Sequence, residues 1–289
     1  MWLIGLSSIF PSRVNAGTGQ VTDYIDSNGR IRLQPSYKQH LTQLLDKAQA
    51  RGLKVNFPVL WEQDGICGAY QNKARMLHTW NAYDYGVEIA QAIGNHPAVG
   101  IWIFGGDAET CYAEVEVWRN LSQGLKANGA NQQIAYHTAS STFGLGSPNL
   151  NSRHIKWATE SWLNILYPQT GQCPSPANSQ AQLQALKTYT QQQGINKPIH
   201  SSEMRYETTK GQNPTFCNPR TNLDAAAHRA DALGALNAGV NALVYGHHDR
   251  WQWGHSELDP SVGAGGGFSA VRNSFNDPGE LQYLDVLKQ

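Results

Sequence analysis

Residues 99–107 read VGIWIFGGD, an apolar run that ends in two glycines and an aspartate. The run predicts a strand with both faces buried, as in a parallel sheet, because Val99–Phe104 carries no charged side chain. Outward from this strand, the chain contains further short runs rich in β-branched, aromatic or other apolar residues. These runs are 2–9, 55–61, 134–137, 163–167, 198–202 and 242–245. The sequence therefore predicts seven strands.

Segments with helical periodicity alternate with these strands. Apolar residues recur at i, i+3 and i+4 in 37–51, 81–94, 113–128, 179–194 and 223–239, and a last helix is predicted at Pro278–Leu287. Each of the first five segments stops at or beside a glycine, as helix C-termini often do. Alternation of short strands and helices is typical of a parallel α/β fold, either a barrel or a doubly wound sheet.

Composition limits the partners. Lys and Arg together number 22, Asp and Glu together number 22, and only 15% of the 289 residues are charged. A chain without net charge has no field that attracts a polyanion, so we expect neither nucleic acid nor an anionic membrane as partner. No apolar stretch approaches the ~18 residues of a membrane span, so we expect a soluble protein. The 9 Trp and 12 Tyr favour a neutral polar ligand such as a sugar, which stacks on aromatic rings.

The four cysteines are widely spaced and form no CxxC pair. We therefore expect no zinc site, and no other sequence feature predicts a metal or a cofactor. We predict two disulfides, Cys67–Cys111 and Cys173–Cys217, each joining loops that follow neighbouring strands; four free thiols in a reducing compartment are the alternative. The disulfides predict a secreted protein. The first ten residues loosely resemble a signal peptide, but they lack a basic n-region and are better interpreted as a strand.

Polar and aromatic residues gather directly after the predicted strands. In parallel α/β folds the C-terminal ends of the strands build the active site. Asp107 follows the strand quoted above, and Glu203 follows the strand at 198–202 in the same manner. Two carboxyl groups that converge on one bond are what glycoside hydrolysis requires, so we predict Asp107 and Glu203 as the catalytic pair.

Other side chains near these strand ends are predicted to bind the substrate. Glu207 is either a supporting residue or a competitor of Glu203, and Arg205 is expected to pair with one of these carboxylates and lower its pKa. Adjacent histidines at 247 and 248 diverge, so a metal site there is rejected in favour of substrate contact. A serine hydrolase is disfavoured because the GxSxG elbow is absent. The predicted substrate-binding residues are Trp61, His137, Gln169, Arg205, Tyr206, Glu207, Tyr245, His247 and Trp251.

Several of these stretches match one known family in the same order. A helix that begins at Asn81 leads to the GGD turn, and Lys197–Glu207 carries a Lys-Pro…Glu…Tyr-Glu pattern. The remaining matches are Arg229, Gly239, Tyr245-Gly246-His247, Trp251, and Pro278-Gly279 with Gln282. From about Leu33 to Leu287 the chain resembles the apiosidase-like glycoside hydrolases, which are retaining (β/α)8-barrel enzymes.

The resemblance implies a fold and a mechanism. It implies an α/β fold of the TIM-like (β/α)8-barrel type, in which the first strand and helix can be missing. It also implies a single domain that spans residues 1–289. It also implies Asp107 as the acid/base and Glu203 as the nucleophile of a glycosidase that cleaves a poly- or oligosaccharide. An inactive carbohydrate-binding barrel is the alternative.

The sequence departs from the family in two places. Gln172 stands where the family has a His, so the resemblance implies a different sugar-binding subsite and does not carry apiosides over as the substrate. The run at 2–9 aligns with the family's second strand, which leaves seven of eight strands. The chain is then a fragment, a barrel that closes without that strand, or a chain whose N-terminus we have misaligned.

Overall fold

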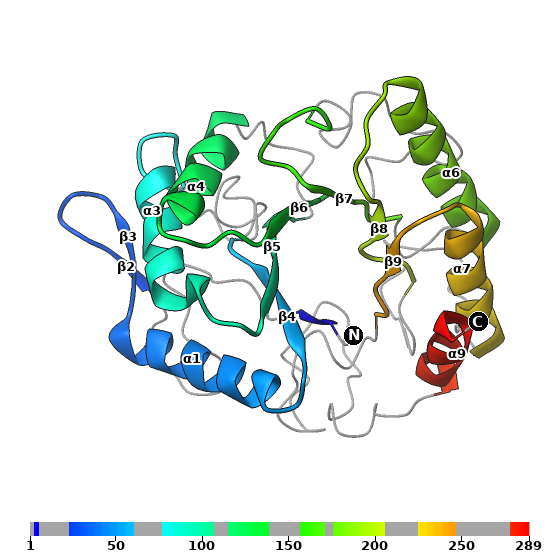
Figure 1. The fold of residues 1–289 in the computed structure, drawn as a ribbon, viewed down its shortest axis with the longest axis horizontal. Helices are drawn as coiled ribbons and strands as arrows, with labels where there is room; N and C mark the ends of the chain where they lie inside the picture. The colour runs from blue at the N-terminus through cyan, green and yellow to red at the C-terminus, as the bar shows by residue number, and fades with distance from the viewer. Residues whose placement is uncertain are drawn as a thin grey trace, which may run out of the picture. The chain divides into compact units, whose positions relative to one another are not determined.

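A computed structural model describes residues 3–5, 23–60, 77–106, 115–138, 157–170, 176–205, 225–246 and 278–288. The chain, whose helices and strands are labelled in Figure 1, divides into two compact units. Unit 1 comprises residues 1–138 and 159–165, and unit 2 comprises residues 139–158 and 166–289.

Unit 1 is built on a parallel sheet. Its strands are β1 (Leu3–Gly5), β4 (Lys54–Pro58), β5 (Val99–Gly105) and β6 (Gln133–His137). They are hydrogen-bonded in the order β1-β4-β5-β6, and β7 (Ile165–Tyr167) comes next, with the unit boundary just after its first residue. Phe57 and Trp102 are register partners whose rings meet edge to face at 5.8 Å. The central strand β5 has its side chains buried, as the continuous apolar run predicts.

Three helical segments accompany this sheet. They are α1 (Pro35–Gln49), α3 (Ala82–Ile89) continued by the π-helical η1 (Ala90–Gly94), and α4 (Val115–Ala127). Glycines let α3 and α4 approach closely. A Cβ added at Gly124 would lie 2.1 Å from the carbonyl oxygen of Tyr83, and a Cβ at Gly86 would lie 2.3 Å from that of Leu121. Neither contact is possible without moving a backbone.

We expect Gly124→Ala to destabilise the protein by about 1–3 kcal/mol, because the added methyl group must push α3 and α4 apart. Urea unfolding measures this change. Gln123→Ala, at an exposed position of the same helix, is the matched control and should change the unfolding free energy by less than about 0.5 kcal/mol. Equal stability of Gly124→Ala and the control would contradict the close approach of the two helices.

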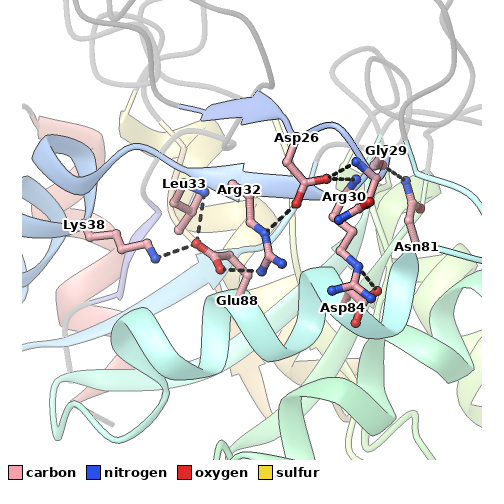
Figure 2. A network of polar contacts seen from close by, with 10 residues as sticks. Asp26, Gly29, Arg30, Arg32, Leu33, Lys38, Asn81, Asp84 and Glu88 are labelled. Carbon is pink, nitrogen blue, oxygen red and sulfur yellow. Dashed lines mark hydrogen bonds and ion pairs between the residues drawn. The ribbon is translucent and has the colours of Figure 1, made fainter.

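A short antiparallel hairpin lies beside α3. It consists of β2 (Asp23–Ile25) and β3 (Ile31–Leu33), and it was not predicted because each strand has only three residues. Figure 2 shows Glu88 of α3 between Lys38 and Arg32, which both pair with its carboxylate. The backbone N–H of Leu33 donates to the same carboxylate at 3.1 Å. Glu88 therefore fastens the hairpin and the start of α1 to α3.

The Glu88 carboxylate is stabilised in its charged form although its side chain is only 5% exposed. Burial alone would raise its pKa, but the hydrogen bonds from Lys38 and Leu33, with the charges of Lys38 and Arg32, bring the pKa of Glu88 below its ordinary value. A lowered pKa in the folded state means that the contact stabilises the fold above the unfolded-state pKa of about 4.3. That stability is lost as the pH falls through the folded-state pKa.

We therefore expect Glu88→Gln to be less stable than the wild type at neutral pH, with a difference that shrinks in acid. Urea unfolding at a series of pH values from 7 down to about 3 measures the difference, since the unfolded-state pKa is about 4.3. Asp285→Gln serves as the control, because that carboxylate is exposed in α9 (Pro278–Leu287). A difference independent of pH would contradict the charged network.

Unit 2 repeats the strand and helix pattern. Its elements are α6 (Pro176–Gln192), β8 (His200–Ser201), α7 (Ala225–Asn237), β9 (Ala242–Leu243) and α9. β8 and β9 pair in parallel, and single bridges join Leu166 to Ile199 and Gln169 to Glu203, also in parallel. Asn241 links the two strands further: its N–H donates to Ile199 O at 2.7 Å, and its side-chain oxygen accepts from Ile199 N–H at 2.9 Å.

All seven predicted strands and all six predicted helices occur at the predicted places, with bounds that shift by a few residues. The pairings recorded for these strands, β1–β4, β4–β5, β5–β6 and β8–β9 with the bridge from β7 to Ile199, are parallel, as the alternation with helices predicts. Among the described helices, none is long and apolar enough to cross a bilayer. The four cysteines lie outside the described residues, so the disulfide pairing stays a prediction.

Candidate active site

In unit 1 the end of β5 forms a glycine turn against β6. Gly105 and Gly106 have φ angles of +83° and +120°, which only glycine adopts without strain. Gly105 is the register partner of His137, and the N–H of Gly106 donates to the carbonyl oxygen of His137 at 3.1 Å. A Cβ at Gly105 would lie 2.2 Å from that oxygen. The two glycines thus let the chain leave β5 in direct contact with β6, immediately before Asp107.

A cluster of aromatic rings supports this turn from the core of unit 1. Phe104 lies next to Gly105, and its ring stacks on Trp118 at 5.2 Å and on Trp162 at 5.6 Å. Tyr136 of β6 meets Trp118 edge to face at 5.8 Å. Rings at these separations pack favourably, and three of the four are fully buried. The cluster fixes the ends of β5 and β6, and with them the buried His137.

In unit 2 the backbone of Glu203 is held on both sides of the residue. The N–H of Thr170 donates to the carbonyl oxygen of Glu203 at 2.9 Å, and the N–H of Ser202 donates to that of Pro168 at 2.9 Å. An isolated parallel β-bridge joins the backbones of Gln169 and Glu203. Two predicted site residues, Gln169 and Glu203, therefore lie side by side at the ends of adjacent strands.

The side chains around Glu203 differ in exposure. Glu203 is partly exposed, whereas Gln169 is only 6% exposed. Among the described residues, no group hydrogen-bonds to the amide oxygen of Gln169 or to the hydroxyl of the buried Ser202. Buried polar atoms without a partner are costly, and a ligand hydroxyl is one group that could satisfy them.

Arg205 has a different partner from the one predicted. Its Nε and Nη2 atoms donate to the two carboxylate oxygens of Asp231 in α7, each at 2.9 Å. Both side chains are buried, with exposed fractions of 9% for Arg205 and 0% for Asp231. Burial raises the pKa of the Asp231 carboxyl, and the hydrogen bonds and charge of Arg205 offset part of that rise. The pair ties the segment after Glu203 to α7.

His228, one turn before Asp231, lies near another predicted site residue. Its ring is fully buried and sits 6.1 Å from the ring of Tyr245, which follows β9. The sequence analysis singled out neither Asp231 nor His228. A signal was present, because a His and an Asp three residues apart share one face of a helix that is otherwise mostly Ala and Leu.

Other predicted residues fall outside the described part of the chain. Within units 1 and 2, as far as the structure describes them, no three His, Cys, Asp or Glu side chains gather as a metal site would require. The predicted residues that the structure does not describe are Asp107, Trp61, Tyr206, Glu207, His247 and Trp251, so their roles stay predictions.

Comparison with known proteins gives the family. The sequence matches the profile of the apiosidase-like catalytic domain over residues 11–285. The chain belongs to the apiosidase-like family. The family resemblance noted in the sequence is thereby confirmed. No curated protein sequence matches the chain significantly.

Solved structures of glycoside hydrolases have a similar fold. A glycoside hydrolase family 5 protein from Bacteroides vulgatus has a TM-score of 0.68 at 17% identity and is matched over 99% of this chain and 60% of its own. Another structure, titled only glycoside hydrolase, has a TM-score of 0.63 at 19% identity, with 87% and 54% covered. The endo-β-1,4-mannanase from Thermotoga petrophila has a TM-score of 0.55 at 13% identity, with 87% and 61% covered.

These likenesses confirm the predicted fold class, α/β of the TIM-like (β/α)8-barrel type. The chain spans only about 60% of the length of the first of these structures. At sequence identities of 13–19%, these similarities show a shared fold and do not show a shared substrate.

Proposed function

We propose that this chain hydrolyses a glycosidic bond in a poly- or oligosaccharide by a retaining mechanism. Membership of a glycosidase family supports the reaction class. The observation that carries the proposal for the site is the position of Glu203, which follows β8 and lies beside the buried Gln169. Catalytic carboxylates of barrel enzymes occupy such strand ends.

In the proposed mechanism Glu203 is the nucleophile and Asp107 the acid/base. The Glu203 carboxylate attacks the anomeric carbon while Asp107 gives its proton to the leaving oxygen, whose bond to that carbon breaks. Asp107 then takes a proton from water, and the water oxygen displaces Glu203 from the sugar. The two carboxyl groups must lie about 5–5.5 Å apart for this chemistry.

The neighbouring residues have proposed supporting roles. The amide oxygen of Gln169, to which no described residue hydrogen-bonds, would accept a hydrogen bond from a sugar hydroxyl. Tyr245 and His137 would line the site at the ends of β9 and β6. Trp61, Tyr206, Glu207, His247 and Trp251 complete the proposed carbohydrate contacts. Arg205, also predicted to bind substrate, holds the backbone after Glu203 through Asp231.

The proposal extends to the organisation of the chain. Residues 1–289 form one catalytic domain, which is secreted and carries the disulfides Cys67–Cys111 and Cys173–Cys217. A thiol assay on denatured, unreduced protein should then detect no free thiol, whereas four free thiols would overturn both bonds.

The test is hydrolysis of polysaccharides and aryl glycosides by the wild type, with the product followed by NMR. A retaining mechanism releases a first product that has the anomeric configuration of the substrate. Release of the opposite anomer would overturn the mechanism. Binding of a glycan without any hydrolysis would favour the inactive carbohydrate-binding barrel instead.

A further inference from the structure

Three exposed aromatic side chains lie at one edge of unit 1. Trp80 is 60% exposed, Tyr24 44% and Tyr83 43%, and these are the exposed aromatic side chains among the described residues. Large apolar side chains gathered on a surface commonly mark a site of interaction.

Contacts with the hairpin turn hold Trp80 in place before α3. Trp80 packs against the turn of the hairpin: a Cβ at Gly29 would lie 2.6 Å from the Cη2 atom of Trp80. The side-chain amide of Asn81 donates to the carbonyl oxygen of Gly29 at 3.4 Å (Figure 2). The indole is also stacked on His78, with ring centres 5.7 Å apart and ring planes 16° apart. The exposed indole is thus fixed in place.

The two tyrosines border the same strip of surface. Tyr83 lies in the first turn of α3, three residues after Trp80, and next to Asp84, which pairs with Arg30 of the hairpin at 3.0 Å. Tyr24 is the register partner of Arg32, two residues beyond Arg30. Two residues of a strand span about 7 Å, so Tyr24 lies about that far along the hairpin from the level of Arg30.

The charges of the described residues in this region balance. Three cations, Arg30, Arg32 and Lys38, pair with three carboxylates, Asp26, Asp84 and Glu88. A surface without net charge offers no attraction to a polyanion, while aromatic rings and half-exposed polar pairs suit the apolar faces and hydroxyl groups of sugars.

The surface lies at the functional end of unit 1. The hairpin directly precedes α1 and Trp80 directly precedes α3, and in strand-helix units the helix N-termini lie at the C-terminal end of the strands. That is the end at which Gly105 and Gly106 turn away from β5.

We propose that Tyr24, Trp80 and Tyr83 form a binding surface for a neutral polysaccharide chain, additional to the catalytic residues. The choice of a glycan as ligand rests on the proposed function. The surface would hold a long substrate and contribute nothing to cleavage of a small aryl glycoside.

The test is affinity gel electrophoresis in glucomannan, mixed-linkage β-glucan, xyloglucan and arabinogalactan, with polygalacturonate as the anionic comparison. The protein carries Glu203→Gln, so that it does not consume the probe. We expect retardation by at least one neutral polysaccharide, and a Kd about tenfold higher after Trp80→Ala, a loss of about 1.4 kcal/mol of binding free energy, because the largest stacking ring is removed. Tyr24→Ala and Tyr83→Ala should weaken binding less, and Trp80→Phe should retain most of it.

Leu281→Ala and Leu287→Ala are matched controls, because these leucines are exposed apolar residues on α9. They should bind as the parent does. No retardation in any neutral probe, or equal retardation after Trp80→Ala, overturns the surface. The proposal is also overturned if the protein binds no glycan but self-associates, and Trp80→Ala abolishes that self-association. The three aromatic residues would then form a protein contact. Hydrolysis by the wild type is scored separately, so the surface and the catalytic proposal can fail independently.

Discussion

Glu203→Gln is expected to lower kcat for glycoside hydrolysis by about four orders of magnitude or more, because an amide cannot form the glycosyl-enzyme. Hydrolysis rates of purified wild type and variant on the same substrate measure this loss. Circular dichroism and thermal unfolding show whether the variant is folded. Folding is expected to persist, because the substitution keeps the backbone carbonyl of Glu203 that accepts the hydrogen bond from the N–H of Thr170.

Asp107→Asn should give a different pattern from Glu203→Gln. Loss of a general acid costs about 10²–10⁴-fold on substrates with poor leaving groups, and much less on aryl glycosides whose leaving group needs no protonation. Glu207→Gln separates the two candidate nucleophiles: we expect it to raise KM more than it lowers kcat. Glu116→Gln is the control, since this carboxylate is 52% exposed on α4. Near-wild-type kcat in Glu203→Gln with collapse in Glu207→Gln would move the nucleophile to Glu207.

The strands and helices could be predicted because their buried side chains produce regular patterns of apolar residues along the sequence. A strand covered on both faces is a continuous apolar run, as in Val99–Phe104, and a helix that faces a sheet repeats its apolar residues every three to four positions. These patterns are local. The position of Glu203 at a strand end follows from them, because the strand that precedes it is such a run.

The contacts that hold the site could not be predicted in the same way. Arg205 and Asp231 are 26 residues apart, and their pairing depends on how α7 packs on the end of β8. From the sequence, the nearby Glu203 and Glu207 were the expected partners. The β2–β3 hairpin escaped prediction for a related reason. Its strands are three residues long, and what fixes them is Glu88, more than fifty residues further along the chain.

Arg205→Met is expected to destabilise the protein by about 3–5 kcal/mol at neutral pH. The substitution keeps most of the side-chain volume but leaves the Asp231 carboxylate buried without its cation. Both guanidinium hydrogen bonds to Asp231 are lost, at a side chain that is 0% exposed. Urea unfolding measures the change.

The pH dependence identifies the cause of this loss. Burial already raises the pKa of Asp231 in the wild type, and removal of Arg205 should raise it further. A carboxyl whose folded-state pKa is raised favours the folded state most below its unfolded-state pKa of about 3.9, and this advantage disappears as the pH rises through the folded-state pKa. The deficit of Arg205→Met should therefore shrink as the pH falls toward 4.

The double variant Arg205→Met with Asp231→Leu provides the internal control. It replaces both charges by apolar groups, so no unpaired charge remains, and buried ion pairs replaced in this way often lose little stability. We expect it to be more stable than Arg205→Met alone. If the double variant were instead as unstable as the sum of the two single variants, the loss would come from packing and not from a stranded carboxylate. The double variant also separates stability from function. If it is folded but inactive, Arg205 contacts the substrate or positions Glu203 in addition to pairing with Asp231 of α7.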